Sequence, residues 1–157
     1  LSTAELNSKW RMDISELDGL VLINDSYNSS PESAEAALRT LVLFAQERGG
    51  QSWAFLGKMH ELGASSPQHH SRLGTLASEL GIDHLVCVGS PEYAAQINDS
   101  GATTVHLFDS KELAAELVSQ MSQGDVVLVK ASRAEKFEEV ADLIVGKWNS
   151  REFGGES

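Results

Sequence analysis

Val21-Leu22-Ile23-Asn24-Asp25-Ser26-Tyr27-Asn28-Ser29-Ser30-Pro31-Glu32-Ser33 is the stretch from which the fold of this chain is predicted. It opens on three apolar residues, as a strand covered on both faces requires. Ser30 is suited to cap a helix, and the Pro-Glu pair after it suits a first helical turn. Polar residues thus lie between a buried strand and a helix, at the edge where open α/β sheets bind ligands. The candidate binding residues of this turn are Asp25, Tyr27 and Asn28.

Strands and helices are predicted to alternate along the rest of the chain. Asp18-Gly19 is typical of a hairpin turn, so a strand at 10–17 is expected to pair antiparallel with the strand at 20–25. Further strands are expected at 51–57, 84–88, 103–107 and 126–129. The pattern predicts an α/β fold: a Rossmann-like, doubly wound sheet of about six strands, mostly parallel, with an antiparallel edge strand from the N-terminal hairpin.

Helices are expected between these strands, each with one apolar face. The inward residues of the first are expected to be Ala34, Ala37, Leu38, Leu41 and Ala45; of the second, Leu73, Leu76, Ala77 and Leu80. A helix over 93–97 follows the turn at Pro91. A helix capped by Ser110 is expected to turn Leu113, Leu117, Val118 and Met121 inward, and the last helix Phe137, Val140, Ala141 and Ile144.

The length of 157 residues fits one domain with a real core. Residues 1–9 lack a hydrophobic period and are expected to be a linker. Residues 10–146 form the predicted domain. The glycines from Gly146 onward predict a frayed tail at 147–157.

The composition excludes several classes of function. A net charge of −11 argues against a nucleic-acid surface or an anionic-membrane surface, both of which require clustered Lys and Arg. No apolar run approaches the roughly 20 residues that a membrane helix needs, so a cytoplasmic protein is expected. The single cysteine, Cys87, lies in an apolar run and is expected to be a core residue.

The common nucleotide-binding and hydrolase motifs are absent from the sequence. There is no GxxxxGK[ST] phosphate loop, no GxGxxG after the first strand and no GxSxG elbow. His69 and His70 are adjacent and do not share a helix face, so no metal site is expected from them. The residues alone predict an α/β binding domain.

Three predicted strand ends carry polar groups: Asp25 to Asn28, Lys58 to Gly63, and Lys130 to Arg133. The turns after parallel strands emerge on one edge of the sheet, so these groups are expected to converge. Lys130 and Arg133 there suit an anion. The alternative is that each polar residue only caps a helix or favours a turn.

Four motifs in order resemble the C-terminal domain of Mur ligases of the MurF type. Residues 24–33 resemble that family's DDSYNANPxS, and Leu56-Gly57-Lys58-Met59-His60-Glu61-Leu62-Gly63 resembles its LG(D/E)MxELG. His70-Ser71-Arg72-Leu73-Gly74 resembles HxxLG, and residues 124–133 resemble GDVVLVK(G/A)SR. Trp10-Arg11-Met12 is similar to the segment leading into this domain, so the resemblance spans nearly the whole chain.

The resemblance implies a function that the residues alone do not. The family adds D-alanyl-D-alanine to UDP-N-acetylmuramoyl-tripeptide (UDP-MurNAc-tripeptide), using ATP and Mg²⁺, in peptidoglycan precursor synthesis. ATP phosphorylates the tripeptide carboxylate and the dipeptide amine attacks the acyl phosphate. In the family a central domain carries the phosphate loop and the metal ligands, and an N-terminal domain holds the uridine nucleotide. This chain resembles only the third domain, so no catalytic group or metal ligand is expected in it, and no activity from it alone.

The resemblance also implies roles at the matched positions. Asp25 would accept hydrogen bonds from ribose hydroxyls, and Tyr27 and Asn28 would contact nucleotide or dipeptide. A dipeptide carboxylate or a phosphate would bind at the last strand end, with Arg133 as a bidentate clamp. That anion site comprises Lys130, Ser132 and Arg133. Glu61 and His70 are expected behind the site or as caps.

Two positions depart from the family pattern. Lys58 stands where the family has an acid, and Ser30 stands where it has asparagine before proline. Ser30, a candidate binding residue, keeps the helix cap with a shorter reach, whereas Lys58 reverses a charge near the site.

Three alternatives remain open from the sequence. One is another Mur-type ligase with a different amino-acid substrate. The second is a stand-alone α/β module that binds an anion or nucleotide, and the third is a structural domain whose polar strand ends only cap helices.

Overall fold

The chain is described by a computed structural model over residues 12–98 and 101–154. Its strands form one sheet in the order β1-β2-β6-β3-β4-β5. They are β1 (Asp13–Leu17), β2 (Leu20–Asp25), β3 (Ser52–Leu56), β4 (His84–Val88), β5 (Thr104–Phe108) and β6 (Val126–Lys130). β1 pairs antiparallel with β2, and all other neighbours are parallel. The predicted sheet of about six strands with an antiparallel edge is confirmed.

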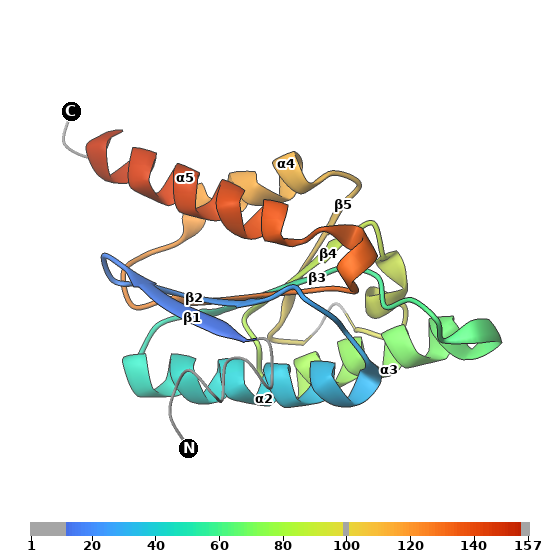
Figure 1. The fold of residues 1–157 in the computed structure, drawn as a ribbon. Coiled ribbons are helices and arrows are strands. Elements are labelled where there is room, and N and C mark those ends of the chain that lie inside the picture. The colour runs from blue at the N-terminus through green and yellow to red at the C-terminus, as the bar shows by residue number, and fades with distance from the viewer. Residues whose placement is uncertain (1–11, 99–100, 155–157) are drawn as a thin grey trace, which may run out of the picture.

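Helices cover both faces of this sheet (Figure 1). The helices α2 (Pro31–Arg48) and α3 (Ser66–Glu79) lie on one face, and α4 (Lys111–Ala115) and α5 (Glu138–Gly154) on the other. The described residues also contain four short 3₁₀ segments: η1 (Gly63–Ser65), η2 (Pro91–Ala94), η3 (Glu116–Gln120) and η4 (Arg133–Glu135). The three layers are those of a doubly wound fold.

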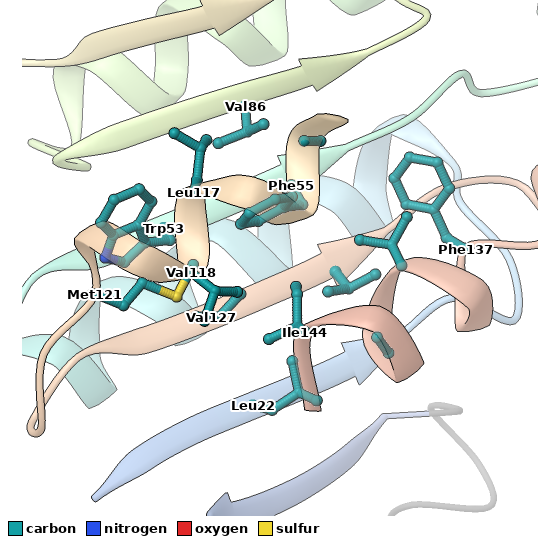
Figure 2. Packing of buried hydrophobic residues seen from close by; sticks show 14 of the residues in the cluster. Leu22, Trp53, Phe55, Val86, Leu117, Val118, Met121, Val127, Phe137 and Ile144 are labelled. Carbon is teal, nitrogen blue, oxygen red and sulfur yellow. The ribbon is translucent and has the colours of Figure 1, made fainter. Parts of the chain in front are cut away.

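The apolar strands are buried on both faces because successive side chains point to opposite sides. In β2, Leu20 and Leu22 belong to the core under α5, whereas Val21 and Ile23 belong to the core over α2. Figure 2 shows the first of these cores, where Trp53 and Phe55 of β3 pack between the strands and the 3₁₀ turn of Leu117.

The entry into α2 follows the sequence prediction. Ser30 caps the helix in a capping box, with Ser33 as its reciprocal partner. All five residues predicted to face inward are buried: Ala34, Ala37, Leu38, Leu41 and Ala45. The helix ends at Gly49 with φ 75°, a left-handed conformation that glycine adopts without strain.

The edge strand β1 is more exposed than its alternating pattern predicts. Ile14 is 45% exposed, because β1 lies at the margin of the sheet. The predicted start at Trp10 and the predicted linker at 1–9 lie outside the described residues.

Two predicted helices are shorter or wound differently. The helix expected over 93–97 is only the 3₁₀ turn η2, anchored by the buried Tyr93. After Ser110, α4 ends at Ala115 and continues as the 3₁₀ segment η3. Leu117, Val118 and Met121 are buried as predicted. Leu113, predicted inward, is 56% exposed, and Ala114 and Ala115 are buried in its place.

The prediction of a frayed tail after Gly146 is wrong over the described residues, because α5 continues to Gly154. Trp148 is buried there, and its Nε1 donates to the carbonyl oxygen of Leu17 at 2.6 Å. This contact, 131 residues apart in sequence, packs the second half of α5 against the hairpin. None of the described helices is both long and apolar enough to cross a membrane.

Candidate functional site

The polar strand ends converge because β6 lies between β2 and β3 in the sheet. In the ladders, Asp25 of β2 pairs with Lys130 of β6, and Lys130 pairs with Leu56 of β3. The three turns that follow therefore leave the sheet side by side. This is the crevice beyond the carboxyl ends of parallel strands where α/β sheets bind ligands.

Asp25 and Lys130 form a buried ion pair at the floor of this crevice. Nζ of Lys130 donates to Oδ2 of Asp25 at 2.8 Å and to the carbonyl oxygen of Asn28 at 2.8 Å. Both residues are nearly inaccessible, with exposed fractions of 3% and 2%. The pair thus ties the turn after β2 to the end of β6.

Burial acts against both charges of this pair. It raises the pKa of Asp25 and lowers the pKa of Lys130, and the mutual attraction and hydrogen bond oppose both shifts. A cation held in this way is already partnered, which makes Lys130 a poorer direct ligand for an incoming anion than an exposed guanidinium.

Arg133 is that exposed guanidinium. Its Cζ lies 5.0 Å from the centroid of the Tyr27 ring, and its Nη1 is 3.4 Å from the Tyr27 hydroxyl. A cation over an aromatic face is held in place without losing its charge. The predicted residues Tyr27 and Arg133, from different motifs, therefore contact each other.

Two open cavities flank Arg133. The first, of about 520 Å³, is lined by Asp13, Asn24, Ser26, Tyr27, Arg133, Lys136 and Glu138. The second, of about 570 Å³, is lined by Asn28, Ser29, Ser30, His60, Glu61, Leu62, Ser132, Arg133 and Ala134. Both volumes fall within the range of small-molecule sites. Residues from all three strand-end turns line the second cavity.

Local hydrogen bonds hold the turn after β2. The Ser26 hydroxyl donates to Oδ1 of Asn24 at 2.7 Å, and the Ser29 amide donates to Oδ1 of Asn28 at 2.9 Å. The side-chain oxygen of Asn28 therefore serves the turn itself. Ser30 lines the second cavity while it caps α2.

The turn after β3 is fixed to the turn after β6. The Ser132 amide donates to the carbonyl oxygen of Lys58 at 3.0 Å, and the His60 amide donates to Oγ of Ser132 at 2.7 Å. The Lys58 side chain is exposed. Glu61 lines the second cavity with φ 65°, a left-handed conformation that costs a non-glycine residue about 1–3 kcal/mol.

His70 lies beneath this turn, where it is 1% exposed. Its Nε2 accepts from the amide of Met59 at 2.9 Å, and its Nδ1 lies 2.7 Å from the carbonyl oxygen of Ser66. Because a carbonyl only accepts, Nδ1 carries the hydrogen and the ring is a neutral imidazole. Its place is behind the turn, one of the two positions considered for it from the sequence.

Two residues of the crevice were not singled out from the sequence. Nε2 of His60 lies 2.6 Å from Oε2 of Glu135, which belongs to η4. His60 occupies the variable position of its motif and Glu135 lies just beyond the last motif, so neither carried a signal. Only the adjacency of β3 and β6 pairs them.

The described residues contain no group of three or more His, Cys, Asp or Glu side chains that could hold a metal ion. The carboxylate at the centre of the crevice, Asp25, is already bound to Lys130. The described part of this chain therefore does not fit as the holder of a catalytic Mg²⁺.

Comparison with known proteins agrees with this geometry. A family model described as "Mur ligase, glutamate ligase domain" matches residues 10–133. The UDP-N-acetylmuramoyl-tripeptide--D-alanyl-D-alanine ligase of Mycobacterium tuberculosis is 36% identical over 166 residues, covering 92% of this chain and 32% of that protein.

Two solved structures share the fold. The MurF ligase of Thermotoga maritima, in complex with ADP, has a TM-score of 0.76 at 30% identity and covers 90% of this chain and 32% of its own. MurF from Acinetobacter baumannii has a TM-score of 0.73 at 28% identity, with 88% and 30% covered. The chain therefore spans about a third of the length of these relatives.

The resemblance that the four motifs carry is thus confirmed over most of the chain. The sheet order, the crevice at the ends of β2, β6 and β3, and the family match lead to one identification. This chain belongs to the Mur ligase family, as a domain of the glutamate ligase type found in MurF ligases.

Proposed function

We propose that this chain is the C-terminal domain of an ATP-dependent amide ligase that joins D-alanyl-D-alanine to UDP-MurNAc-tripeptide in peptidoglycan precursor synthesis. The printed name of the 36% identical relative is that of such a ligase. The observation on this chain that supports the proposal is the convergence of its motifs around the Asp25–Lys130 pair. The reaction would take place in the cytoplasm, where ATP and nucleotide-linked precursors are available.

Arg133 is the residue we assign to an anionic group, either the dipeptide carboxylate or a phosphate. It is exposed, lies between both cavities and is held by Tyr27. Its guanidinium can donate two parallel hydrogen bonds to a carboxylate. Lys130 supports this site indirectly, because its ammonium donates to Asp25 and to the carbonyl oxygen of Asn28 and so holds the turn after β2.

The turn after β2 is assigned to nucleotide and dipeptide contacts. Tyr27 is 42% exposed and offers a ring face and a hydroxyl to the first cavity. Asn28, Ser30 and Ser132 line the second. Asp25, expected from the resemblance to bind ribose hydroxyls, is 3% exposed and lines neither cavity, so we assign it instead to holding the turn through Lys130.

ATP and Mg²⁺ belong to this proposal as requirements of the whole protein. The sequence of the chain has no phosphate loop. Since the described residues do not fit a metal site, no step is assigned to Mg²⁺ here. The ADP complex of the Thermotoga maritima relative supports nucleotide binding in the complete protein.

The test compares ligation by the full-length protein with that of matched arginine variants. Arg133→Lys keeps one charge but loses the bidentate geometry, and we expect a tenfold or greater loss of kcat/KM for the dipeptide. Arg39→Lys is the control, since Arg39 lies on the exposed face of α2 and pairs with Glu35. Equal kinetics for the Arg133 variant and the wild type would remove Arg133 from the site.

Two further measurements separate the alternatives. Ligation with single amino acids in place of the dipeptide would indicate a Mur-type ligase with another amine substrate. Saturable nucleotide binding and magnesium-dependent ATP turnover by the 157-residue chain alone would indicate a stand-alone module. We expect neither result.

A further inference from the structure

His60 lines the second cavity and forms a hydrogen-bonded pair with Glu135, which is not among the residues that line it. Nε2 of His60 and Oε2 of Glu135 are 2.6 Å apart, and the two side chains are 38% and 30% exposed. His60 follows β3 and Glu135 follows β6. The His60 amide donates to Ser132, so the backbone and the ring of His60 are both held from the β6 side.

The carboxylate of Glu135 determines which ring nitrogen of His60 is basic. An ionised carboxylate only accepts hydrogen bonds, so Nε2 of His60 carries the hydrogen and Nδ1 keeps its lone pair. Among the described residues, Nδ1 of His60 has no hydrogen-bond partner. If Nδ1 takes a proton, the imidazolium charge faces Glu135 directly. A histidine oriented and charge-stabilised in this way is the usual form of a general base.

The second cavity is also lined by a cationic group that suits the carboxylate end of a dipeptide. Arg133 lines it, and Arg133 adjoins the Ser132 that binds the His60 amide. An extended two-residue peptide spans about 7 Å between its ends, which fits a cavity of about 570 Å³. A carboxylate bound by Arg133 keeps the ammonium of the same molecule within about 7 Å, in the cavity that His60 also lines. The other charged group that lines this cavity is Glu61, which attracts an ammonium.

We propose that His60 is the base that takes a proton from the ammonium of the incoming dipeptide, and that Glu135 positions it. This inference rests on the proposed function. The ammonium passes a proton to Nδ1 of His60, and the free amine attacks the carbonyl carbon of the acyl phosphate. A C–N bond forms, and the C–O bond to phosphorus-bound oxygen breaks. Phosphate leaves with that electron pair and takes up the second proton lost from nitrogen.

The test separates the phosphorylation step from the attack of the amine. Exchange of labelled ADP into ATP, dependent on the nucleotide-linked peptide and measured without dipeptide, reports acyl-phosphate formation by the full-length protein. We expect His60→Gln to keep this exchange within about twofold while ligation falls by about 10²-fold, the usual contribution of a general base. Glu135→Gln keeps a hydrogen-bonding group without the charge and should give a smaller loss.

A pH profile adds a signature that a purely structural role would not produce. A peptide amine loses its proton unaided above about pH 8, so ligation by His60→Gln should recover toward wild type as the pH rises through that value. His69→Gln is the matched control, because His69 is a half-buried histidine on α3 outside both cavities.

Three results would overturn the inference. The first is wild-type ligation by His60→Gln. The second is an equal loss of exchange and ligation, which would mean that the pair only ties two turns together. The third is a wild-type protein with neither exchange nor ligation, which would refute the proposed function itself and the base with it.

Discussion

Nζ of Lys130 lies 2.8 Å from Oδ2 of Asp25, although 105 residues separate the two in the chain. They are direct neighbours in the β2–β6 ladder, and both are almost fully buried. Because the same ammonium also donates to the carbonyl oxygen of Asn28, the pair holds the turn that carries Tyr27. Its removal is therefore expected to affect stability before it affects any ligand.

Removal of one partner of this pair should strongly destabilise the fold. Lys130→Met leaves the Asp25 carboxylate buried without its cation, a loss of about 3–5 kcal/mol in the free energy of unfolding. The double variant Asp25→Leu/Lys130→Met should lose much less, since no charge remains buried. Urea unfolding of the wild type, the two single variants Asp25→Leu and Lys130→Met, and the double variant measures the coupling.

Lys111→Met is the matched control for this cycle. Lys111 pairs with Glu139 at 2.6 Å on the surface, where water screens the charges. A stability change as small for Lys130→Met as for Lys111→Met would show that the buried pair contributes nothing.

His70→Phe should destabilise the turn after β3. The variant removes the acceptor of the Met59 amide, and Met59 is fully buried, so an unpaired donor remains at a cost of about 1–3 kcal/mol. Amide hydrogen exchange at Met59 should accelerate together with the loss in global stability. His69→Phe, at the neighbouring half-buried position of α3, should leave that exchange rate unchanged. Equal effects of both variants would contradict the assignment.

Two helical glycines should respond to alanine in opposite directions. A Cβ at Gly74 in α3 would lie 1.6 Å from the carbonyl oxygen of Tyr93, so Gly74→Ala must push α3 away from η2. A Cβ at Gly146 in α5 meets nothing within 4 Å. Gly146→Ala should raise the free energy of unfolding by about 0.5–1 kcal/mol, because alanine favours a helix over glycine. Thermal unfolding of both variants measures this, and a destabilised Gly146→Ala would contradict it.

Two histidines should make the fold sensitive to mild acid. Nδ1 of His84 lies 3.1 Å from Nε2 of His106, and the His84 ring stacks on Trp53 at 3.6 Å. Burial lowers the pKa of His84, opposed by Asp83 and Asp125; burial and the neighbouring His84 lower the pKa of His106. Only one of the two facing nitrogens can donate, so a doubly protonated pair loses this bond.

The direction in which pH changes the stability follows from the two lowered pKa values. A lowered pKa in the folded state means that the unfolded chain binds protons first, so stability is present above about pH 6.5 and is lost as the pH falls below it. The double variant His84→Gln/His106→Gln should therefore show a smaller drop in Tm between about pH 7.5 and about pH 5 than the wild type. An unchanged drop would show that other groups carry the acid sensitivity; His69→Gln serves as the control for histidine number.

Local sequence was sufficient to predict the structure wherever the determining interactions lie within a few residues of each other. The cap at Ser30 and the apolar stripe of α2 depend on spacing within one helix, and both are as predicted. The prediction failed where long-range packing overrides a local signal. Gly146 reads as a helix end, but Trp148 packs against Leu17 and α5 continues.

For the site, too, some features were predictable from the sequence and others depended on tertiary structure. From the sequence alone came the α/β class, the residues at three strand ends and the family to which they belong. Tertiary structure decided which of those residues meet: β6 enters the sheet between β2 and β3, and this single placement pairs Asp25 with Lys130 and His60 with Glu135. The physical reason is that strand periodicity encodes which faces are buried but not which strand is the neighbour. That choice is made by the packing of helices on both faces of the sheet.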